Sequence, residues 1–170
     1  MPASNSEARK RRSDGADHLW APPVATISKY VEMDTGHRVP MHASKCSNPH
    51  GHRYRVTAFV EGPILPPRGE TDDGMVVDFG DIKALLTEHV HDVYDHAFVV
   101  WQYDEALLDF LHTQGWRYVS VPFVPTAECM AQHFYDVLAP RLGDRGLHLV
   151  AIEVQETPSS IARYQPEVRS

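Results

Sequence analysis

The sequence predicts one α+β domain built on antiparallel strand pairs. The chain has 170 residues, which is enough for a single domain with its own hydrophobic core. Segments that alternate apolar and polar residues come in pairs near the two ends of the chain, and segments with helical spacing lie between these pairs. Strand pairs that are separated by a run of helices are typical of α+β proteins.

The first half of the chain is expected to hold two strands and one helix. Residues 24–37 and 50–61 alternate well enough for two strands, and a Gly-Pro pair ends the second one. A loop follows over 65–69, and then a short strand-like segment over 74–79. Apolar residues spaced three and four apart predict a helix over 81–93.

Turn and cap residues divide the second half of the chain. Gly115 follows a helical pattern and ends it, because glycine readily closes a helix. Thr126 is a good N-cap, and a turn at Pro158-Ser159 separates the last two strands. The elements expected here are a helix over 104–114, a strand over 116–121, a helix over 127–142, and strands over 147–156 and 161–164.

Charge and composition limit the classes of function. The net charge of −7 argues against general nucleic-acid binding, which needs a basic surface. No stretch of about 18 apolar residues is present to span a membrane. The N-terminus has no apolar segment typical of a signal peptide. Two cysteines make a poor disulfide framework, so a cytoplasmic location is expected.

The first 22 residues differ from the rest. Residues 1–22 are rich in Ser, Ala, Arg and Asp and are expected to form a disordered tail before a single domain over 23–170. The basic run Arg9–Arg12 is either a nucleic-acid patch or part of a solvated tail, and the second interpretation is favoured.

A histidine pair at the start of the second strand is the strongest chemical signal. His50 and His52 are two residues apart, so their side chains point to the same face of a strand. His37, near the end of the adjacent strand, is the natural third donor. Catalytic zinc sites commonly use three protein ligands and keep a fourth position open. The alternative is an exposed polar strand start, and the three histidines together favour a zinc site.

The two cysteines have different predicted roles. Cys46 lies one short loop before the histidine pair, among polar neighbours. It is either a fourth ligand, which would close the site, or a reactive thiol beside an open site, where a nearby cation or metal favours the thiolate. Cys129 lies in an apolar helical pattern, so core packing is its expected role.

Three acidic residues and one more histidine are weaker candidates. Asp95 and His96 are adjacent, and adjacent side chains in a turn point apart, so no direct hydrogen bond is expected between them. A surface loop is the simpler interpretation of this pair. Glu156 lies on the face of its strand that also carries apolar residues, where a carboxylate is costly unless it has a partner. Glu128 lies near the start of the helix that follows Thr126.

Taken together, these residues resemble the 6-pyruvoyltetrahydropterin synthase and 6-carboxytetrahydropterin synthase family over about residues 25–165. Any one of the matching blocks is weak, but six in register are specific. The blocks are Gly36-His37-Arg38, Lys45-Cys46 through His50-Gly51-His52, Gly74-Met75-Val76-Val77-Asp78-Phe79 with Ile82-Lys83, Asp95-His96, Pro125-Thr126-Ala127-Glu128, and Glu156-Thr157.

The resemblance implies the tunnelling fold (T-fold) and an assembly. Each subunit would contribute a four-stranded antiparallel sheet with helices on one face. Subunits would join edge to edge into an oligomeric barrel, which removes unpaired sheet edges. The implied homo-oligomer is a hexamer of two stacked trimers, with active sites between subunits.

The resemblance also implies a role for each candidate residue. Three histidines would bind Zn2+, three residues would be catalytic, and three would bind the substrate. By motif, the zinc ligands are His37, His50 and His52, the catalytic residues are Cys46, Asp95 and His96, and the pterin is held by Glu156 with Thr126 and Glu128 assisting.

The implied reaction starts from 7,8-dihydroneopterin triphosphate. One branch of the family releases acetaldehyde and triphosphate and makes 6-carboxytetrahydropterin, a precursor of queuosine and other 7-deazaguanines. The other branch is 6-pyruvoyltetrahydropterin synthase, which eliminates triphosphate only. The short Cys-x-x-x-His-Gly-His spacing is the bacterial form and favours the carboxy branch. A non-catalytic zinc- and pterin-binding paralogue is the third alternative, and the retention of Cys46, Asp95 and His96 argues against it.

Overall fold

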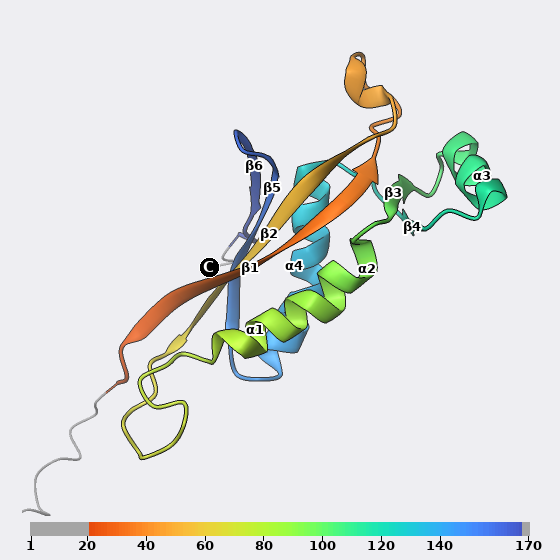
Figure 1. Cartoon of the computed structure of the whole chain (residues 1–170). Coiled ribbons are helices and arrows are strands. Elements are labelled where there is room, and N and C mark those ends of the chain that lie inside the picture. The colour runs from red at the N-terminus through yellow and green to blue at the C-terminus, as the bar shows by residue number, and fades with distance from the viewer. Residues whose placement is uncertain (1–20, 168–170) are drawn as a thin grey trace, which may run out of the picture.

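A mixed sheet of six strands forms the centre of the protein in the computed structural model, which describes residues 21–167 (Figure 1). The tail expected over 1–22 therefore lies outside the described residues, apart from its last two. The strands are β1 (Val24–His37), β2 (His50–Pro63), β3 (Phe98–Trp101), β4 (Tyr118–Val121), β5 (His148–Thr157) and β6 (Ser160–Tyr164). The helices are α1 (Phe79–Leu86), α2 (Asp92–Tyr94), α3 (Glu105–Gln114) and α4 (Ala127–Gly143), with a 3-10 turn at Lys45–Ser47 and a π-helical segment at Thr87–His91.

The strands β1, β2, β5 and β6 make the antiparallel part of the sheet. The order across the sheet is β4-β3-β1-β2-β5-β6, and the pairs β1–β2, β2–β5 and β5–β6 are antiparallel. This part confirms the predicted four-stranded antiparallel sheet. Two short strands, β3 and β4, extend it in parallel beyond β1, so the whole sheet has six strands rather than four.

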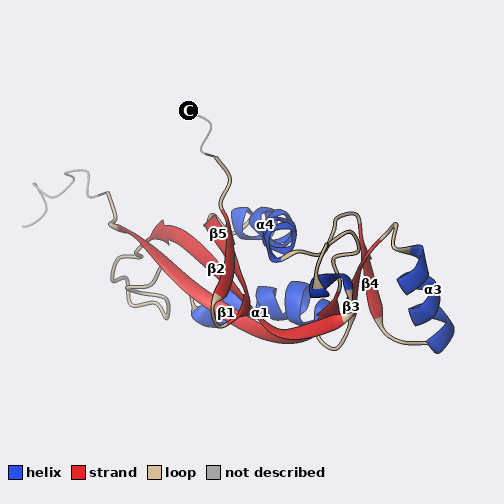
Figure 2. Ribbon diagram, turned by 90° about the horizontal axis from the view of Figure 1, so that it is seen from above, coloured by secondary structure: helices blue, strands red, loops and turns tan. Residues whose placement is uncertain are grey.

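The hydrophobic core lies between the sheet and the helices on one of its faces (Figure 2). Along β2, Tyr54, Val56 and Val60 are buried on that face. Phe134 and Leu138 of α4 belong to the same core. Further buried core residues come from α1 and its π-helical continuation, among them Ile82, Leu85, Leu86 and Val90. Helices on one face were predicted, and they leave the other face of the antiparallel strands open.

Two sequence predictions of strands were wrong. Residues 74–79 form turns and the start of α1. Gly74 has a φ of +78°, which is typical of a turn. The Asp78 side chain is the N-cap of α1 and accepts a hydrogen bond from Gly80 N–H. Residues 74–79 therefore form a loop and the start of a helix. The strand β3 was missed, since its four residues are too few to show a period. The helix expected over 81–93 is confirmed, and it extends from 79 to 94 with a π-helical turn inside.

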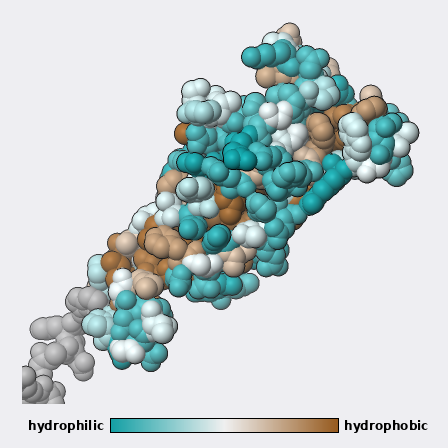
Figure 3. Space-filling model, viewed as in Figure 1, coloured by the Kyte–Doolittle hydropathy of each residue, from teal (hydrophilic) through white to brown (hydrophobic). Residues whose placement is uncertain are grey.

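The segment that contains α3 stands away from the main body (Figure 1). Asp104 caps α3 and also forms an ion pair with Arg38 directly after β1, which ties this segment to the sheet. Hydrophilic side chains cover most of the face seen in Figure 3, and hydrophobic ones show toward the end where β1 begins and toward α3. Within 21–167, no helix has the length and apolar character needed to cross a membrane.

Candidate metal centre

The pairing of β1 with β2 brings three histidines together. His37 and His50 are directly opposite each other in the register, and His52 lies two residues further along β2 on the same face. One nitrogen from each ring lies within 4.8 Å of the other two. The ring centroids of His37 and His50 are 4.5 Å apart, and those of His50 and His52 are 4.9 Å apart. This three-histidine cluster has the donor set that zinc prefers.

Hydrogen bonds assign the same tautomer to two of these rings. Nδ1 of His37 lies 2.7 Å from the carbonyl oxygen of Pro125, and Nδ1 of His50 lies 2.8 Å from that of Asn48. A carbonyl only accepts hydrogen bonds, so each Nδ1 carries the proton. The Nε2 atoms therefore keep their lone pairs. Outer contacts of this kind orient histidine ligands at metal sites.

The environment of His52 and the protonation states of His37 and His52 also fit a bound metal. Nε2 of His52 is buried and has no hydrogen-bond partner among the described residues, which a metal bond would satisfy. Burial lowers the pKa of His37 and also that of His52, because it disfavours the charged imidazolium. Both rings are therefore held in the neutral form that binds metal.

Tyr54 adjoins the cluster and was missed in the sequence. Its hydroxyl lies 3.0 Å from Nε2 of His37 and donates to Oε1 of Glu156 at 3.2 Å. Burial raises the pKa of Tyr54, so it stays a neutral donor. The strand alternation contained the signal, since Tyr54 follows His52 by two residues and shares its face.

A cavity of about 390 Å³ brings His37 of the cluster together with all three predicted substrate-binding residues. Its walls include His37, Cys46 and Glu156, together with Thr126 and Glu128 at the start of α4. Oε1 of Glu156 lies 3.5 Å from Nε2 of His37. Thr126 also caps α4, as its sequence position predicts, by accepting from Cys129 N–H. Five predicted residues thus meet in one place.

The position of Cys46 bears on its two predicted roles. Cys46 lies in the 3-10 turn before β2, is half-buried and has a free thiol. Within the described residues, the group with metal-ligand spacing contains the three histidines and not Cys46. This geometry favours a thiol beside an open metal site over a fourth ligand.

Asp95 and His96 are not among the residues of the same chain that line that cavity. They line a separate cavity of about 280 Å³ together with Asp34 of β1 and Arg53 of β2. Both of these side chains lie on the face of the sheet opposite the core. The prediction that Asp95 and His96 make no direct hydrogen bond was wrong, because Nδ1 of His96 lies 2.7 Å from Oδ2 of Asp95. The backbone explains it: His96 has a φ of 56°, a left-handed conformation that turns its side chain back toward Asp95.

Comparisons with known proteins agree with this arrangement. The family model described as 6-pyruvoyl tetrahydropterin synthase matches residues 26–167. A protein of Haemophilus influenzae named 6-carboxy-5,6,7,8-tetrahydropterin synthase is 32% identical over 82% of this chain and 97% of its own length. A protein of the same name from Aquifex aeolicus is 31% identical over 83% of this chain and 98% of its own.

Solved structures show the same fold. An uncharacterized protein of Wolinella succinogenes superposes with a TM-score of 0.70 and 24% identity, over 85% of this chain and 99% of its own. The 6-pyruvoyl tetrahydropterin synthase of Caenorhabditis elegans superposes with a TM-score of 0.62 and 22% identity, over 86% and 98%. The second likeness confirms the predicted tunnelling fold. With its family match, its relatives and its fold in agreement, this chain belongs to the 6-pyruvoyl tetrahydropterin synthase family.

Proposed function

We propose that this protein is a zinc-dependent 6-carboxy-5,6,7,8-tetrahydropterin synthase. It would convert 7,8-dihydroneopterin triphosphate and one water to 6-carboxytetrahydropterin, acetaldehyde and triphosphate, in the biosynthesis of queuosine or related 7-deazaguanines. The observation that carries the proposal is the cavity whose walls include His37 of the three-histidine cluster, the free thiol of Cys46 and the carboxylate of Glu156. The names of the Haemophilus and Aquifex relatives support the carboxy branch.

The chain's own groups account for substrate binding. Glu156 is the pterin anchor, because an ionised carboxylate can accept two parallel hydrogen bonds from a ring N–H and the adjacent amino group. The Tyr54 hydroxyl fixes Oε1 of Glu156 from the side of the core. Thr126 and Glu128 line the same cavity and complete the pocket. Zinc held by the three histidines would supply Lewis acidity toward the side-chain oxygens of the substrate.

Proton transfer is assigned to Cys46 and the Asp95–His96 couple. Asp95 accepts from Nδ1–H of His96, which leaves Nε2 of His96 with the lone pair that takes a proton. Oδ1 of Asp95 also accepts from Asp34 N–H at 2.8 Å, so the carboxylate is anchored on β1. The pKa of Asp95 is held below its ordinary value: burial raises it, but the hydrogen bonds from Asp34 and His96 outweigh that effect.

A neighbouring subunit would bring these groups to Cys46. The thiol and the couple line different cavities of one chain, whereas His96 is highly exposed and available to another chain. Among the described residues, the outer edges of β4 and β6 have no strand partner, and such edges favour pairing. A homo-oligomer, most simply a hexamer of two trimers, would form the complete site. The cytoplasmic location stays a prediction.

Turnover by the purified, zinc-loaded protein tests the proposal. Incubation with 7,8-dihydroneopterin triphosphate is expected to release triphosphate and a carboxypterin. The Cys46→Ala variant serves as the matched control that keeps the metal ligands and loses the thiol. Tight substrate binding without any release of triphosphate would instead identify a non-catalytic pterin-binding paralogue.

A further inference from the structure

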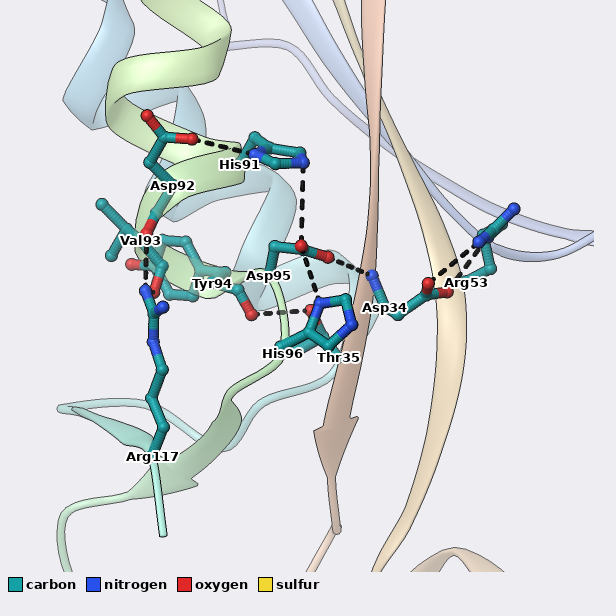
Figure 4. A network of polar contacts seen from close by, with 10 residues as sticks. All are labelled: Asp34, Thr35, Arg53, His91, Asp92, Val93, Tyr94, Asp95, His96 and Arg117. Carbon is teal, nitrogen blue, oxygen red and sulfur yellow. Dashed lines mark hydrogen bonds and ion pairs between the residues drawn. The ribbon is translucent and has the colours of Figure 1, made fainter.

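His91 lies against the carboxylate of Asp95, although no sequence motif singled it out. Its Nε2 is 3.7 Å from Oδ2 of Asp95, and its Nδ1 is 2.9 Å from Oδ1 of Asp92 (Figure 4). Ionised carboxylates only accept hydrogen bonds, so both ring nitrogens are matched at once only when the imidazole is protonated. His91 therefore lies between two carboxylates, and each of them faces one of its ring nitrogens.

The helix has an unusual shape at this position. His91 is the last residue of the π-helical segment Thr87–His91, and its carbonyl accepts from Asp95 N–H at 2.8 Å. A π-helical turn contains one extra residue, which rotates the side chains that follow it, and such turns are frequent at functional sites. Here the turn ends where the helix presents His91 to Asp95.

The other charged groups around Asp95 are already paired. Arg53 of β2 forms a two-point ion pair with Asp34 of β1, at 3.0 and 2.9 Å. Within the described part of the chain, the ion-pair partners of Asp95 are His91 and His96. The further charged groups facing this network are Glu32, which is paired with Arg55, and Arg117, which donates to the carbonyls of Asp92 and Val93.

Exposure separates the roles of the two histidines. His96 is 76% exposed, His91 40% and Asp95 23%. His96 is therefore the histidine that a neighbouring subunit or substrate can contact more readily. His91 is less exposed and lies beside the carboxylate of Asp95. Both rings nevertheless line one cavity, together with Asp34 and Arg53.

We propose that His91 is a positioning residue that acts through Asp95, keeping this carboxylate ionised and aimed at Nδ1–H of His96. The inference rests on the proposed function, in which His96 transfers a proton at Nε2. The charge of His91 is one of the causes that lower the pKa of Asp95, so its removal raises this pKa. A protonated Asp95 lacks the negative charge that strengthens the hydrogen bond from Nδ1–H of His96, so its hold on the His96 ring would weaken.

The test compares His91→Gln with His91→Lys, which restores a cation, and with His112→Gln, an exposed histidine of α3 outside the network. Because the loss concerns one support of a general base, His91→Gln is expected to lower kcat roughly tenfold with little change in KM. The acid limb of the kcat–pH profile is expected to move to higher pH. His91→Lys should recover part of the loss, and His112→Gln should match the unchanged protein.

Nitrogen NMR of the His96 ring gives a readout that needs no turnover. The unchanged protein should show mainly the Nδ1–H tautomer, and His91→Gln should increase the Nε2–H fraction. Unchanged kcat, pH profile and tautomer in His91→Gln would overturn the inference while the proposed function stands. Equal losses in the Gln and Lys variants would overturn the role of the charge. If the unchanged protein shows no turnover but His91→Gln still alters the His96 tautomer, the inference would be sustained and the proposed function contradicted.

Discussion

Replacement of His50 by alanine is expected to remove one metal ligand with little effect on folding, so it tests metal binding separately from stability. His50 is partly exposed and its ring bonds only to the carbonyl of Asn48, whereas His37 is 2% exposed and lies in the core. Structural zinc sites with four ligands are worth about 10–16 kcal/mol, or roughly 2.5–4 kcal/mol per ligand. Loss of one of three imidazoles is therefore expected to weaken zinc binding by roughly 100-fold or more.

The assay is elemental analysis of the purified variant, followed by a zinc titration against a competing chelator. His148→Ala is the matched control, because His148 is an exposed histidine at the opposite end of the same sheet. This control should keep about one zinc per chain, the stoichiometry of a three-ligand site. Full zinc retention by the His50→Ala protein, with its fold intact, would refute the assignment of the cluster as the metal centre.

Four further outcomes are expected. Cys46→Ala should fold and keep its zinc but lose turnover, and loss of metal in this variant would make Cys46 a ligand. Glu156→Gln should weaken substrate binding by about thirtyfold, since removing one partner of a buried charged hydrogen bond costs at least about 2 kcal/mol; unchanged affinity would move the anchor to Glu128. Burial lowers the pKa values of His37 and His52, so in the metal-free protein the unfolded state binds protons that the folded state does not, and the free energy of unfolding should fall as the pH drops below about 6.5. Thermal melts in chelator at neutral and acid pH measure this fall, and greater stability in acid would contradict it. Light scattering should show a trimer or larger, most simply a hexamer, and a stable monomer would contradict the shared active site.

The three-histidine cluster could be predicted from the sequence because the pattern that brings it together is local. Two histidines at i and i+2 share a strand face, and an adjacent antiparallel strand can supply the third, as His37 opposite His50 does. The same period contained Tyr54, but an apolar ring with one hydroxyl gives no signal of chemistry until its neighbours are known. Its contact with Glu156 joins residues 102 positions apart in the chain.

The features that the sequence did not predict depend on backbone detail or on distant packing. The Asp95–His96 hydrogen bond requires the left-handed backbone of His96, which a rule about adjacent side chains does not anticipate. The segment 74–79 has apolar residues typical of a strand, but Gly74 and the cap at Asp78 turn it into a loop. The short strand β3 forms only because β1 and β4 pair with it on either side.

The product of 7,8-dihydroneopterin triphosphate tests the central claim most directly. Mass spectrometry of the pterin, with enzymatic measurement of acetaldehyde in the same reaction, distinguishes the two branches of the family. The zinc-loaded protein is expected to consume one water and to form 6-carboxytetrahydropterin with one acetaldehyde and one triphosphate per turnover, as the reaction's atom balance requires. A 6-pyruvoyl pterin formed without acetaldehyde would contradict the carboxy assignment and make the protein a 6-pyruvoyltetrahydropterin synthase.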